Sequence, residues 1–560
     1  MKGLKNVKFG TTFMLLCSLV LILFLAACNS DKGANEPTPT PDATNNNKDG
    51  DQGQGQSNSN DKKLTLKWFV NGSNNSSLPP KDKDFVRKTI EEKFNVDLQI
   101  EHMQVGADFI TKLNLMMAGR DVPDMFMSDG ATSNTYIKDG LTLDMTGLVT
   151  PEKMPNYFKY WVKEDELERY KVQNKFMRAP VPFAKQQYVS YYVRQDWIDN
   201  LKAKGVDVDI PTNYEEMIEV MKAFTFNDPD NNGKDDTKGF TTVGNGTLPY
   251  VYWPEYLKNG LYGLGLVNDQ LVDGYSDLKV QQVLDDIRKV IDMKVVDEDW
   301  FLQKTGEDIN KAAQGKAGIF WSGSRFAALD NDPNSVQFKT KEILKSAGKA
   351  EEAEKVDWQP FHPFADTGVA TEALPGNPFM FGKDTPLENV ERTLQILDWM
   401  ASEEGFLLVR YGQEGVHYKR DGNTITLDAD AYKRDVVDQG DFLNIYQFFA
   451  TADEPQVFGL EVVRPTETDR DRAILEKLRT YKYLPSIGTN VAPPEGYNLA
   501  DFRNQLYSVL SKILFEEQDA SNWPTYREEL MDKYGGRAVF EAYAEQMSKA
   551  HGRTITFRDK

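Results

Sequence analysis

The sequence predicts an α/β protein, and three observations support this class. Segments with the spacing of strands and of helices alternate from residue 64 to residue 127. The chain has 560 residues, which is enough to bury a large hydrophobic core and to form two or more domains. Both cysteines, Cys17 and Cys28, precede this alternation, so no thiol is left to form a disulfide or bind a metal in the folded part. The fold therefore rests on its hydrophobic core.

The alternation begins with a strand pattern, in which apolar residues recur at every second position from Leu64 to Trp68. A helix, a strand, a helix and a strand are then expected at residues 84–94, 96–100, 109–117 and 124–127. This order is typical of a doubly wound sheet, whose ligands bind at the carboxyl ends of the strands. We therefore expect Asn71, Ser128 and Asp129 at a rim that could bind a ligand.

The N-terminal segment predicts export. Lysines precede an apolar run from Phe13 to Ala27, which ends in small residues. The sequence Leu25-Ala26-Ala27-Cys28 resembles the lipobox of bacterial lipoproteins. This resemblance implies a signal peptide at 1–27 and a lipidated Cys28, which holds the protein at the extracellular face of the cell membrane through its acyl chains, palmitate among them. The alternative is an uncut anchor, but the run is shorter than the ~20 residues of a spanning helix.

Residues 28–62 form the next segment, which we expect to be a disordered tether. After Cys28 it consists mainly of Asp, Asn, Gly, Ser, Gln, Pro and Thr and contains no large apolar residue. Such a composition cannot build a core. A flexible chain of this length spans about 30 Å, which is enough to lift a domain off the bilayer.

The charge and the composition of the chain indicate which classes of molecule it is expected to bind. The formal net charge is −20 and is spread along the chain, which disfavours nucleic acids and anionic membrane surfaces as partners. Aromatic residues make up 11% of the chain, and a surplus of flat rings suits a protein that stacks on a ligand.

A more specific resemblance begins with the sequence Tyr192-Val193-Arg194-Gln195-Asp196-Trp197. A short helix follows, and then Pro211-Thr212-Asn213-Tyr214-Glu215-Glu216 opens another helix, with Thr212 as the expected N-cap. These segments resemble the extracellular solute-binding proteins of ABC importers, and in particular the large lipoprotein branch of the maltose-binding-like family (solute-binding protein family 1). The resemblance covers nearly the whole chain after Leu64.

This resemblance implies a two-lobe α/β fold of the periplasmic-binding-protein type (type II), with crossover strands and a ligand cleft between the lobes. The first lobe would contain residues 63–187 and about 375–430. The second lobe would contain residues 188–374 and about 431–560. Such proteins close on their ligand.

The loop 227–237 carries a calcium pattern, because oxygen ligands at alternate positions with a glycine at the sixth suit a hard cation. Counted from Asp228 as first, the expected ligands are Asp228, Asp230, Asn232, Lys234 through its carbonyl, and Asp236. The twelfth position is Gly239, where an EF-hand has glutamate. The loop resembles the calcium loop of oligosaccharide-binding members of the family, which implies a structural Ca²⁺ that braces the second lobe. An acidic turn that holds water is the alternative.

Aromatic ligand candidates lie in Pro249-Tyr250-Val251-Tyr252-Trp253-Pro254, which resembles the segment of the maltose-binding class whose tyrosine stacks on sugar. Sugars need aromatic platforms with hydrogen-bonding groups nearby. Tyr250 is the first stacking candidate, and Trp253 lies behind it. The alternative for isolated aromatic residues is the hydrophobic core.

Residues 315–325 resemble a family segment that faces the cleft. A strand through Trp321 and Ser322 runs into a glycine turn, where backbone N–H groups could donate to ligand oxygens. Arg325 stands where the maltose-binding class has a stacking tryptophan. A guanidinium can stack on a ring or bind a carboxylate, so acidic sugars stay open as ligands. A surface salt bridge is the alternative for Arg325.

The sequence Tyr411-Gly412-Gln413-Glu414-Gly415-Val416-His417-Tyr418 also resembles the lipoprotein branch. His417 receives no chemical role, and a structural histidine is the favoured interpretation. Helical spacing of apolar residues from Phe502 to Phe515, and again from Tyr526 to Tyr534, predicts C-terminal helices.

These patterns favour a lipid-anchored, monomeric receptor that captures a solute, expected to be an oligosaccharide, and delivers it to ABC permease subunits. No catalytic residue is predicted, since the sequence holds no Gly-x-Ser-x-Gly, His-Glu-x-x-His, P-loop or Cys-x-x-Cys motif. The alternatives are a lipid-anchored carbohydrate-active enzyme, in which two carboxylates would act, and a sensory binding protein without a transporter.

Overall fold

The computed structural model describes residues 62–72, 76–104, 107–128, 130–172, 175–184, 188–248, 252–373, 378–489 and 491–560. Residues Ser59–Lys560 form one compact unit. The predicted signal peptide, Cys28 and the tether up to residue 61 lie outside the described residues, as do Asp129 and Tyr250.

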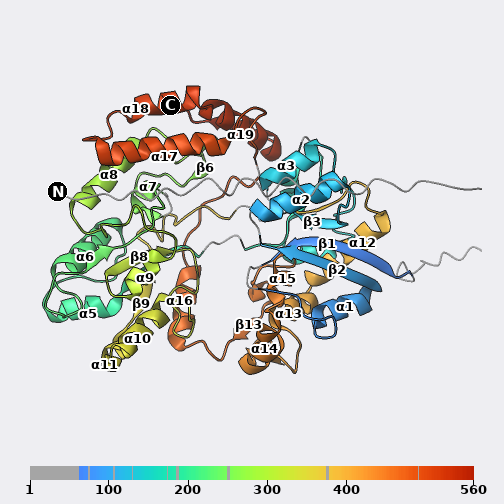
Figure 1. The fold of residues 1–560 in the computed structure, drawn as a ribbon, viewed down its shortest axis with the longest axis horizontal. Coiled ribbons are helices and arrows are strands. Elements are labelled where there is room, and N and C mark those ends of the chain that lie inside the picture. The colour runs from blue at the N-terminus through green and yellow to red at the C-terminus, as the bar shows by residue number, and fades with distance from the viewer. Residues whose placement is uncertain are drawn as a thin grey trace, which may run out of the picture. The chain divides into compact units, whose positions relative to one another are not determined.

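The N-terminal sheet confirms the predicted alternation of strands and helices (Figure 1). Its order is β10-β3-β1-β2. Strands β1 (Leu64–Asn71), β2 (Val96–Met103) and β3 (Met125–Met127) are parallel, while β10 (Phe379–Phe381) joins β3 in the antiparallel direction. Helices α1 (Phe85–Phe94) and α2 (Ala107–Gly119) connect the three parallel strands.

The core of this sheet also contains segments from much later in the chain. Helices α12 (Leu387–Met400), α13 (Glu403–Tyr411) and α15 (Leu443–Gln447) contribute buried residues to it. Buried residues from Val436 to Ala450 belong to the same core, beyond the approximate end of the first predicted lobe. The lobe boundaries themselves stay a prediction.

The second large sheet has the order β5-β8-β4-β9 and supports a separate core. Strands β5 (Lys238–Phe240) and β8 (Ala317–Ser322) are parallel, whereas β4 (Ser190–Arg194) runs antiparallel to β8 and to β9 (Trp358–Phe361). The chain is therefore a mixed α/β protein with two central sheets.

The predicted passage from strand to helix after Tyr192 is present, since β4 leads directly into α5 (Gln195–Ala203). The next helix, α6 (Tyr214–Phe226), is capped by Asn213 rather than by the expected Thr212. The Asn213 side chain accepts the Glu216 N–H at 2.9 Å, and the Thr212 hydroxyl instead donates to the Glu216 carboxylate at 2.8 Å.

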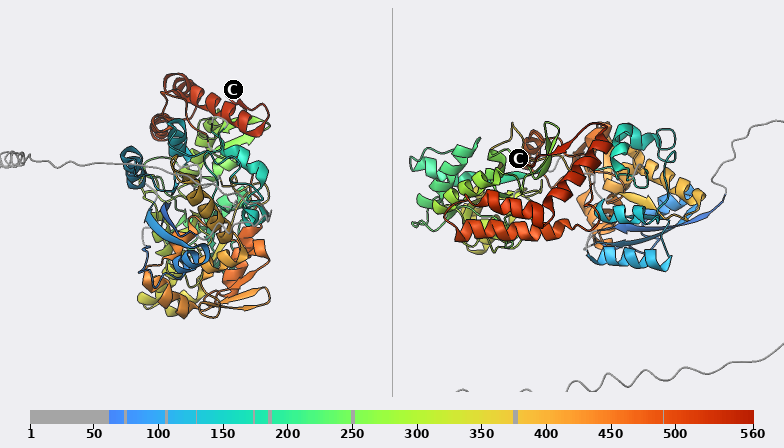
Figure 2. Two further views of the ribbon diagram at one scale, coloured as in Figure 1. Left: turned by 90° about the vertical axis from the view of Figure 1, so that its right-hand side faces the viewer. Right: turned by 90° about the horizontal axis from the view of Figure 1, so that it is seen from above.

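Helices α17 (Leu499–Glu516) and α18 (Trp523–Lys533) confirm the two helical patterns predicted near the C-terminal end of the sequence, and α19 (Gly536–His551) follows them. Their buried faces share the core of α8 (Val280–Asp292). Helices α17 and α18 contact α8, and Figure 2 shows these red helices beside the green part of the chain.

Two small sheets complete the described strands. One has the order β14-β7-β6 and the other β11-β12-β13. Their strands are β6 (Leu264–Val267), β7 (Gln270–Asp273), β14 (Thr556–Phe557), β11 (Tyr418–Asp421), β12 (Thr424–Leu427) and β13 (Glu461–Val463). The remaining helices are α3 (Gly130–Lys138), α4 (Pro155–Tyr160), α7 (Pro254–Lys258), α9 (Glu307–Ala313), α10 (Val336–Ser346), α11 (Ala350–Lys355), α14 (Ala429–Asp435) and α16 (Asp469–Arg479), with 3₁₀ turns η1 (Glu164–Tyr170), η3 (Val437–Gln439) and η4 (Pro455–Phe458). None of the helices in the described ranges has the length and apolar character needed to span a bilayer.

Candidate functional site

Arg325 lies just beyond β8 and connects the second sheet to a later loop. Its guanidinium forms an ion pair with Asp453 and leaves only 18% of the side chain exposed. The same group lies 4.7 Å from the ring centre of Phe326 and 5.4 Å from that of Tyr188. Arg325 therefore has both of the partners expected of such a residue, a carboxylate and aromatic rings, within its own chain.

Asp453 is the centre of this cluster. The Tyr411 hydroxyl donates to Asp453 Oδ1 at 2.7 Å, and Arg464 donates to Oδ2 at 3.4 Å. Burial raises the pKa of Asp453, but the charges of the arginines around it outweigh burial and hold the pKa at about 2. The carboxylate is therefore ionised at neutral pH.

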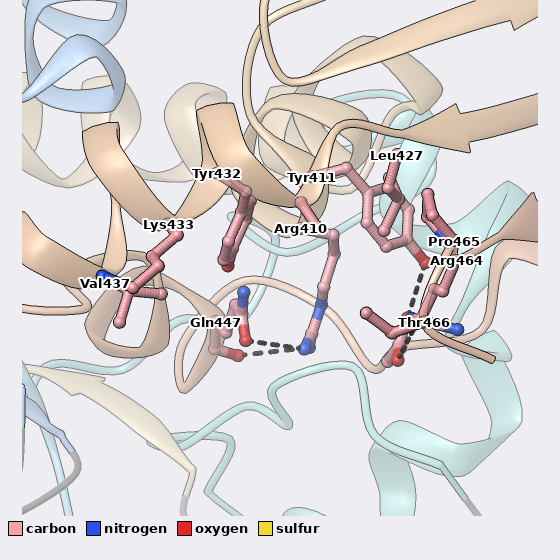
Figure 3. A pocket seen from close by; sticks show the side chains of 12 residues that line it. Arg410, Tyr411, Leu427, Tyr432, Lys433, Val437, Gln447, Arg464, Pro465 and Thr466 are labelled. Carbon is pink, nitrogen blue, oxygen red and sulfur yellow. Dashed lines mark hydrogen bonds and ion pairs between the residues drawn. The ribbon is translucent and has the colours of Figure 1, made fainter. Parts of the chain in front are cut away.

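A cavity of about 350 Å³ opens beside Asp453 (Figure 3). It is lined from the end of α13, from β12, α14 and α15, and from the loop after β13. The lining residues are Arg410, Tyr411, Leu427, Ala429, Tyr432, Lys433, Val437, Gln447, Asp453, Arg464, Pro465 and Thr466. Its volume and its mix of aromatic, apolar and a few polar groups are typical of a small-ligand site, for which about 300–1,000 Å³ is usual.

The cations of this cavity differ in their pairing. Lys433 contacts Asp438 at 2.6 Å, and Arg464 contacts both Asp453 and Glu467. Within the described ranges Arg410 forms no ion pair. Its Nη1 donates to the Gln447 side chain at 3.2 Å, while its buried Nε has no hydrogen-bond partner there. Figure 3 shows the Arg410 side chain directed toward Gln447, with dashed lines for the two hydrogen bonds between them.

The acidic loop brings its predicted oxygens together. Asp228 Oδ1 accepts the N–H groups of Asn232 and Gly233 at 2.9 and 3.2 Å. The Asn232 amide donates to Asp230 at 2.9 Å and to Asp236 at 3.0 Å. Burial and the nearby Asp236 and Asp228 carboxylates raise the pKa of Asp230, although a hydrogen bond from the Asn232 N–H opposes this. Converging carboxylates repel one another unless a cation neutralises them.

The loop also departs from an EF-hand for a steric reason. Its twelfth position, Gly239, lies in β5, where an added Cβ would meet the Met221 carbonyl oxygen at 2.4 Å. A carboxylate ligand therefore has no room at this position. No group of three or more His, Cys, Asp or Glu side chains in the described part could by itself hold a metal ion, so the amide of Asn232 and the Lys234 carbonyl have to complete any oxygen site.

Trp253 and Trp321 occupy different environments. Trp253 is 1% exposed and packs edge-to-face on Trp300, 4.9 Å between ring centres, so the structure places it in the hydrophobic core. Trp321 is only half-buried and contacts Tyr252 edge-to-face at 4.7 Å. Ser322 is 7% exposed, and its hydroxyl accepts the Ser324 N–H at 3.1 Å. Of these three residues, Trp321 has the most accessible side chain.

The expected rim of the first sheet contains unsatisfied polar groups. Asn71 ends β1 and Ser128 follows β3, and both are fully buried. Neither the Asn71 amide nor the Ser128 hydroxyl has a hydrogen-bond partner within the described ranges. Buried polar groups rarely stay unpaired. Asp129 follows Ser128 in the sequence and lies outside the described residues.

Sequence reasoning missed Arg410, Asp453 and Arg464. Arg410 directly precedes the Tyr411–Tyr418 motif, which is the one signal that pointed to this region. His417, from the same motif, is 1% exposed, accepts the Gln413 N–H at 2.8 Å through Nδ1 and stacks on Phe85. These contacts suit the structural interpretation of His417.

Comparison with known proteins found three related sequences. The chain is 25% identical over 379 residues to the polygalacturonan/rhamnogalacturonan-binding protein YtcQ of Bacillus subtilis (strain 168), which covers 64% of this chain and 68% of YtcQ. It is 24% identical over 343 residues to the fructooligosaccharide ABC transporter substrate-binding protein FusA of Streptococcus pneumoniae serotype 4, which covers 57% of this chain and 58% of FusA. Lipoprotein LipO of Bacillus subtilis is 26% identical over 243 residues, which is 42% of this chain and 45% of LipO. No protein-family model matches the chain.

Solved structures of solute-binding proteins share the fold. An HMO-binding, ABC-transporter-associated solute-binding protein from Bifidobacterium longum infantis superposes with a TM-score of 0.63 at 17% identity, over 87% of this chain and 99% of its own. An EF-hand mutant of Streptococcus pneumoniae FusA, in complex with fructo-nystose, superposes with a TM-score of 0.57 at 17% identity over the same shares.

Proposed function

We propose that this chain, a homologue of the substrate-binding proteins of ABC transporters with the α/β fold of solute-binding proteins, captures an oligosaccharide outside the cell and delivers it to permease subunits. The observation that carries this proposal is the alignment of 379 residues with YtcQ at 25% identity. YtcQ is named for the saccharides it binds. FusA, which is named as an ABC transporter substrate-binding protein for fructooligosaccharides, supports the same function.

Lipid anchoring forms part of the proposal. Cys28 follows a lipobox-like sequence, and the related LipO is named a lipoprotein. The acyl chains on Cys28 would hold the protein at the outer face of the cell membrane, and residues 29–62 would act as the tether. The protein works as a monomer in this scheme.

Capture would occur by closure of two lobes, one at residues 63–187 and about 375–430 and the other in the remainder. A ligand that contacts both lobes stabilises the closed form and shifts the population toward it. The ligand-binding residues of this proposal are Asp129, Tyr250, Trp321, Ser322 and Arg325. Trp253 supports the site from the core rather than by direct contact.

A structural calcium ion belongs to the proposed holoprotein. Oxygens of Asp228, Asp230, Asn232 and Asp236, with the Lys234 carbonyl, form a donor set that suits Ca²⁺. The structure of FusA described as an EF-hand mutant indicates that a relative has such a motif. The ion would brace the loop between α6 and β5 and supply no chemistry to the ligand.

The first test is a titration of the purified protein with neutral and acidic oligosaccharides, monosaccharides and peptides, followed by thermal unfolding and by chromatography of the sugar. A ligand that binds only the native state raises the melting temperature. We expect a rise with an oligosaccharide that is recovered intact. A sugar that is consumed would replace this proposal with the enzyme alternative, and binding of peptides alone would exclude a carbohydrate receptor.

Uptake separates a transport receptor from a sensory one. A strain that lacks this gene should take up less of the labelled sugar, and the wild-type gene should restore uptake. Cys28→Ala should restore it poorly, because the receptor would leave the membrane. Normal uptake in the deletion strain would favour the sensory alternative.

A further inference from the structure

The cavity beside Asp453 contains one cation, Arg410, that forms no ion pair with a described residue, although the charge of Asp453 still acts on it. Arg464 and Arg325 both contact Asp453, Arg464 also contacts Glu467, and these groups neutralise one another. Lys433 is paired with Asp438. Among the residues that the structure describes, the guanidinium of Arg410 is held only by the Gln447 side chain at 3.2 Å and, weakly, by the Gln447 carbonyl at 3.5 Å.

Arg410 is also incompletely hydrogen-bonded. Its Nε–H is shielded from solvent and has no acceptor among the described residues. A guanidinium offers five donors in a planar fork that matches the two oxygens of a carboxylate. A buried charge with an unused donor costs free energy unless a partner supplies an acceptor.

The rest of the lining suits a sugar ring. Tyr432 from α14 is half-buried, and Leu427 and Pro465 add apolar surface. Figure 3 shows the Tyr432 ring and the Arg410 side chain directed into the same space. A volume of about 350 Å³ fits a single sugar unit better than a long segment.

We propose that this cavity binds the carboxylate of an acidic sugar unit, with Arg410 as its charged partner and Tyr432 against the sugar ring. The inference rests on the proposed function and names its substrate class as uronate-containing oligosaccharides. Among the described residues around this cavity, Arg410 is the one cation without an ion pair, which matches a monoanion. A phosphate dianion would bring a second negative charge with no cation left to pair it.

The test compares trigalacturonate with its full methyl ester, by isothermal titration calorimetry on the full-length protein in detergent. The ester keeps the sugar chain and removes the negative charges. We expect trigalacturonate to bind about 10- to 100-fold more tightly than the ester, as expected for hydrogen bonds to a charged group. High salt should reduce the difference.

Arg410→Gln should abolish this preference, so that trigalacturonate and its ester bind with similar affinity. Arg434→Gln is the matched control, because Arg434 lies on α14 and pairs with Asp435 outside the cavity. Arg410→Lys keeps the charge without the planar fork, and it should give an intermediate affinity. If Arg410→Gln fails to fold, the affinity of Arg410→Lys and the comparison of trigalacturonate with its ester test whether the cavity binds a carboxylate.

Equal binding of trigalacturonate and ester, or unchanged binding of trigalacturonate by Arg410→Gln, would overturn the inference while the oligosaccharide receptor stands. Binding of inorganic phosphate that depends on Arg410, without binding of trigalacturonate, would also overturn it. If neither of these sugars nor the neutral fructooligosaccharide kestose binds, the proposed function itself fails.

Discussion

The Tyr411 hydroxyl donates a 2.7 Å hydrogen bond to Asp453, which joins the end of α13 to a loop 42 residues later. Tyr411 is 3% exposed, and its ring also packs edge-to-face on Phe406. This bond therefore couples the buried cluster that contains Phe406 and Tyr411 to the carboxylate that Arg325 reaches from the end of β8.

Tyr411→Phe removes only this hydroxyl. We expect the free energy of unfolding to fall by about 1.5–3 kcal/mol, the usual range for a hydrogen bond to a charged group. Urea denaturation followed by circular dichroism measures the change. The exposed Tyr534→Phe serves as control and should change stability by less than about 0.5 kcal/mol. Equal stability of both variants and the wild type would show that the bond contributes nothing.

Protonation of Asp453 in acid should lower the free energy of unfolding. Its pKa is held at about 2, below the ordinary 3.8, by the surrounding arginines against the opposing effect of burial. A depressed pKa contributes stability above pH 3.8, and this contribution is lost as the pH falls toward 2. It is on the order of 2 kcal/mol. Asp453→Asn should flatten the stability curve between pH 4 and pH 2, and an unchanged slope would contradict the assignment.

Ionisation of Glu255 should lower the free energy of unfolding as the pH rises, which is the opposite pH dependence. It is 1% exposed, and burial raises its pKa to about 7 despite a hydrogen bond from Tyr214. A raised carboxyl pKa means that stability falls as the pH rises from 4.5 through 7. Glu255→Gln should therefore stabilise the protein at pH 8, by up to about 3 kcal/mol, and have little effect at pH 4.

The control for this prediction is Glu219→Gln, since Glu219 is 65% exposed on the neighbouring α6. It should show the wild-type dependence on pH. Chemical denaturation across the pH range compares the three proteins. A Glu255→Gln variant that is less stable than the wild type at pH 8 would show that the carboxylate is favourable in the fold.

Calcium should stabilise the protein through the acidic loop. At a calcium concentration 100 times Kd, binding to the native state adds about 2.7 kcal/mol. Asp230→Asn should remove most of the rise in melting temperature, and EDTA should reverse that rise in the wild type. Asp209→Asn is the control, because Asp209 is exposed and pairs with Lys202 outside the loop. A rise that survives in Asp230→Asn would place the ion elsewhere.

Substitution of Trp253 should mainly lower stability, whereas substitution of Trp321 should mainly lower the affinity for the ligand. Trp253→Ala removes a fully packed indole and should cost about 3–5 kcal/mol of stability. Trp321→Ala should cost less stability but lower the affinity for the oligosaccharide by tenfold or more, as expected for a lost aromatic contact of about 1.5 kcal/mol. Calorimetry and thermal unfolding on both variants measure this. Unchanged affinity in Trp321→Ala would remove it from the proposed site.

Local patterns explain which parts of the fold were predictable. Periodic apolar residues mark the strands that begin at Leu64 and Val96, and also the helix between them. These two strands pair with each other and lie close in the sequence. Strand β10 has only three residues, Phe379–Phe381, and its partner β3 ends at Met127. No local signal reveals such a distant pairing. Likewise, both Thr212 and Asn213 suit an N-cap, and the choice depends on a single hydrogen bond.

The candidate site was less predictable than the fold. Arg325 was identified from a motif, but its partner Asp453 lies 128 residues later in an unremarkable stretch. Arg410 could be identified only from the three-dimensional structure, which shows that no described carboxylate forms an ion pair with it. Pairing of charges is a property of packing, so a sequence that contains 66 Lys and Arg and 86 Asp and Glu does not reveal which cation of this cavity lacks an ion pair among the described residues.

The position of β10 has a consequence for biosynthesis. Strand β3 has β1 on one side and β10 on the other, so its outer edge stays open until residue 381 has been made. At roughly 5–20 residues per second, the intervening ~250 residues take about 10–50 s. An open apolar edge is prone to pair with other chains during that interval. A nascent chain that stops short of Phe379 should therefore depend on chaperones, whereas one that passes Phe381 can protect its own sheet.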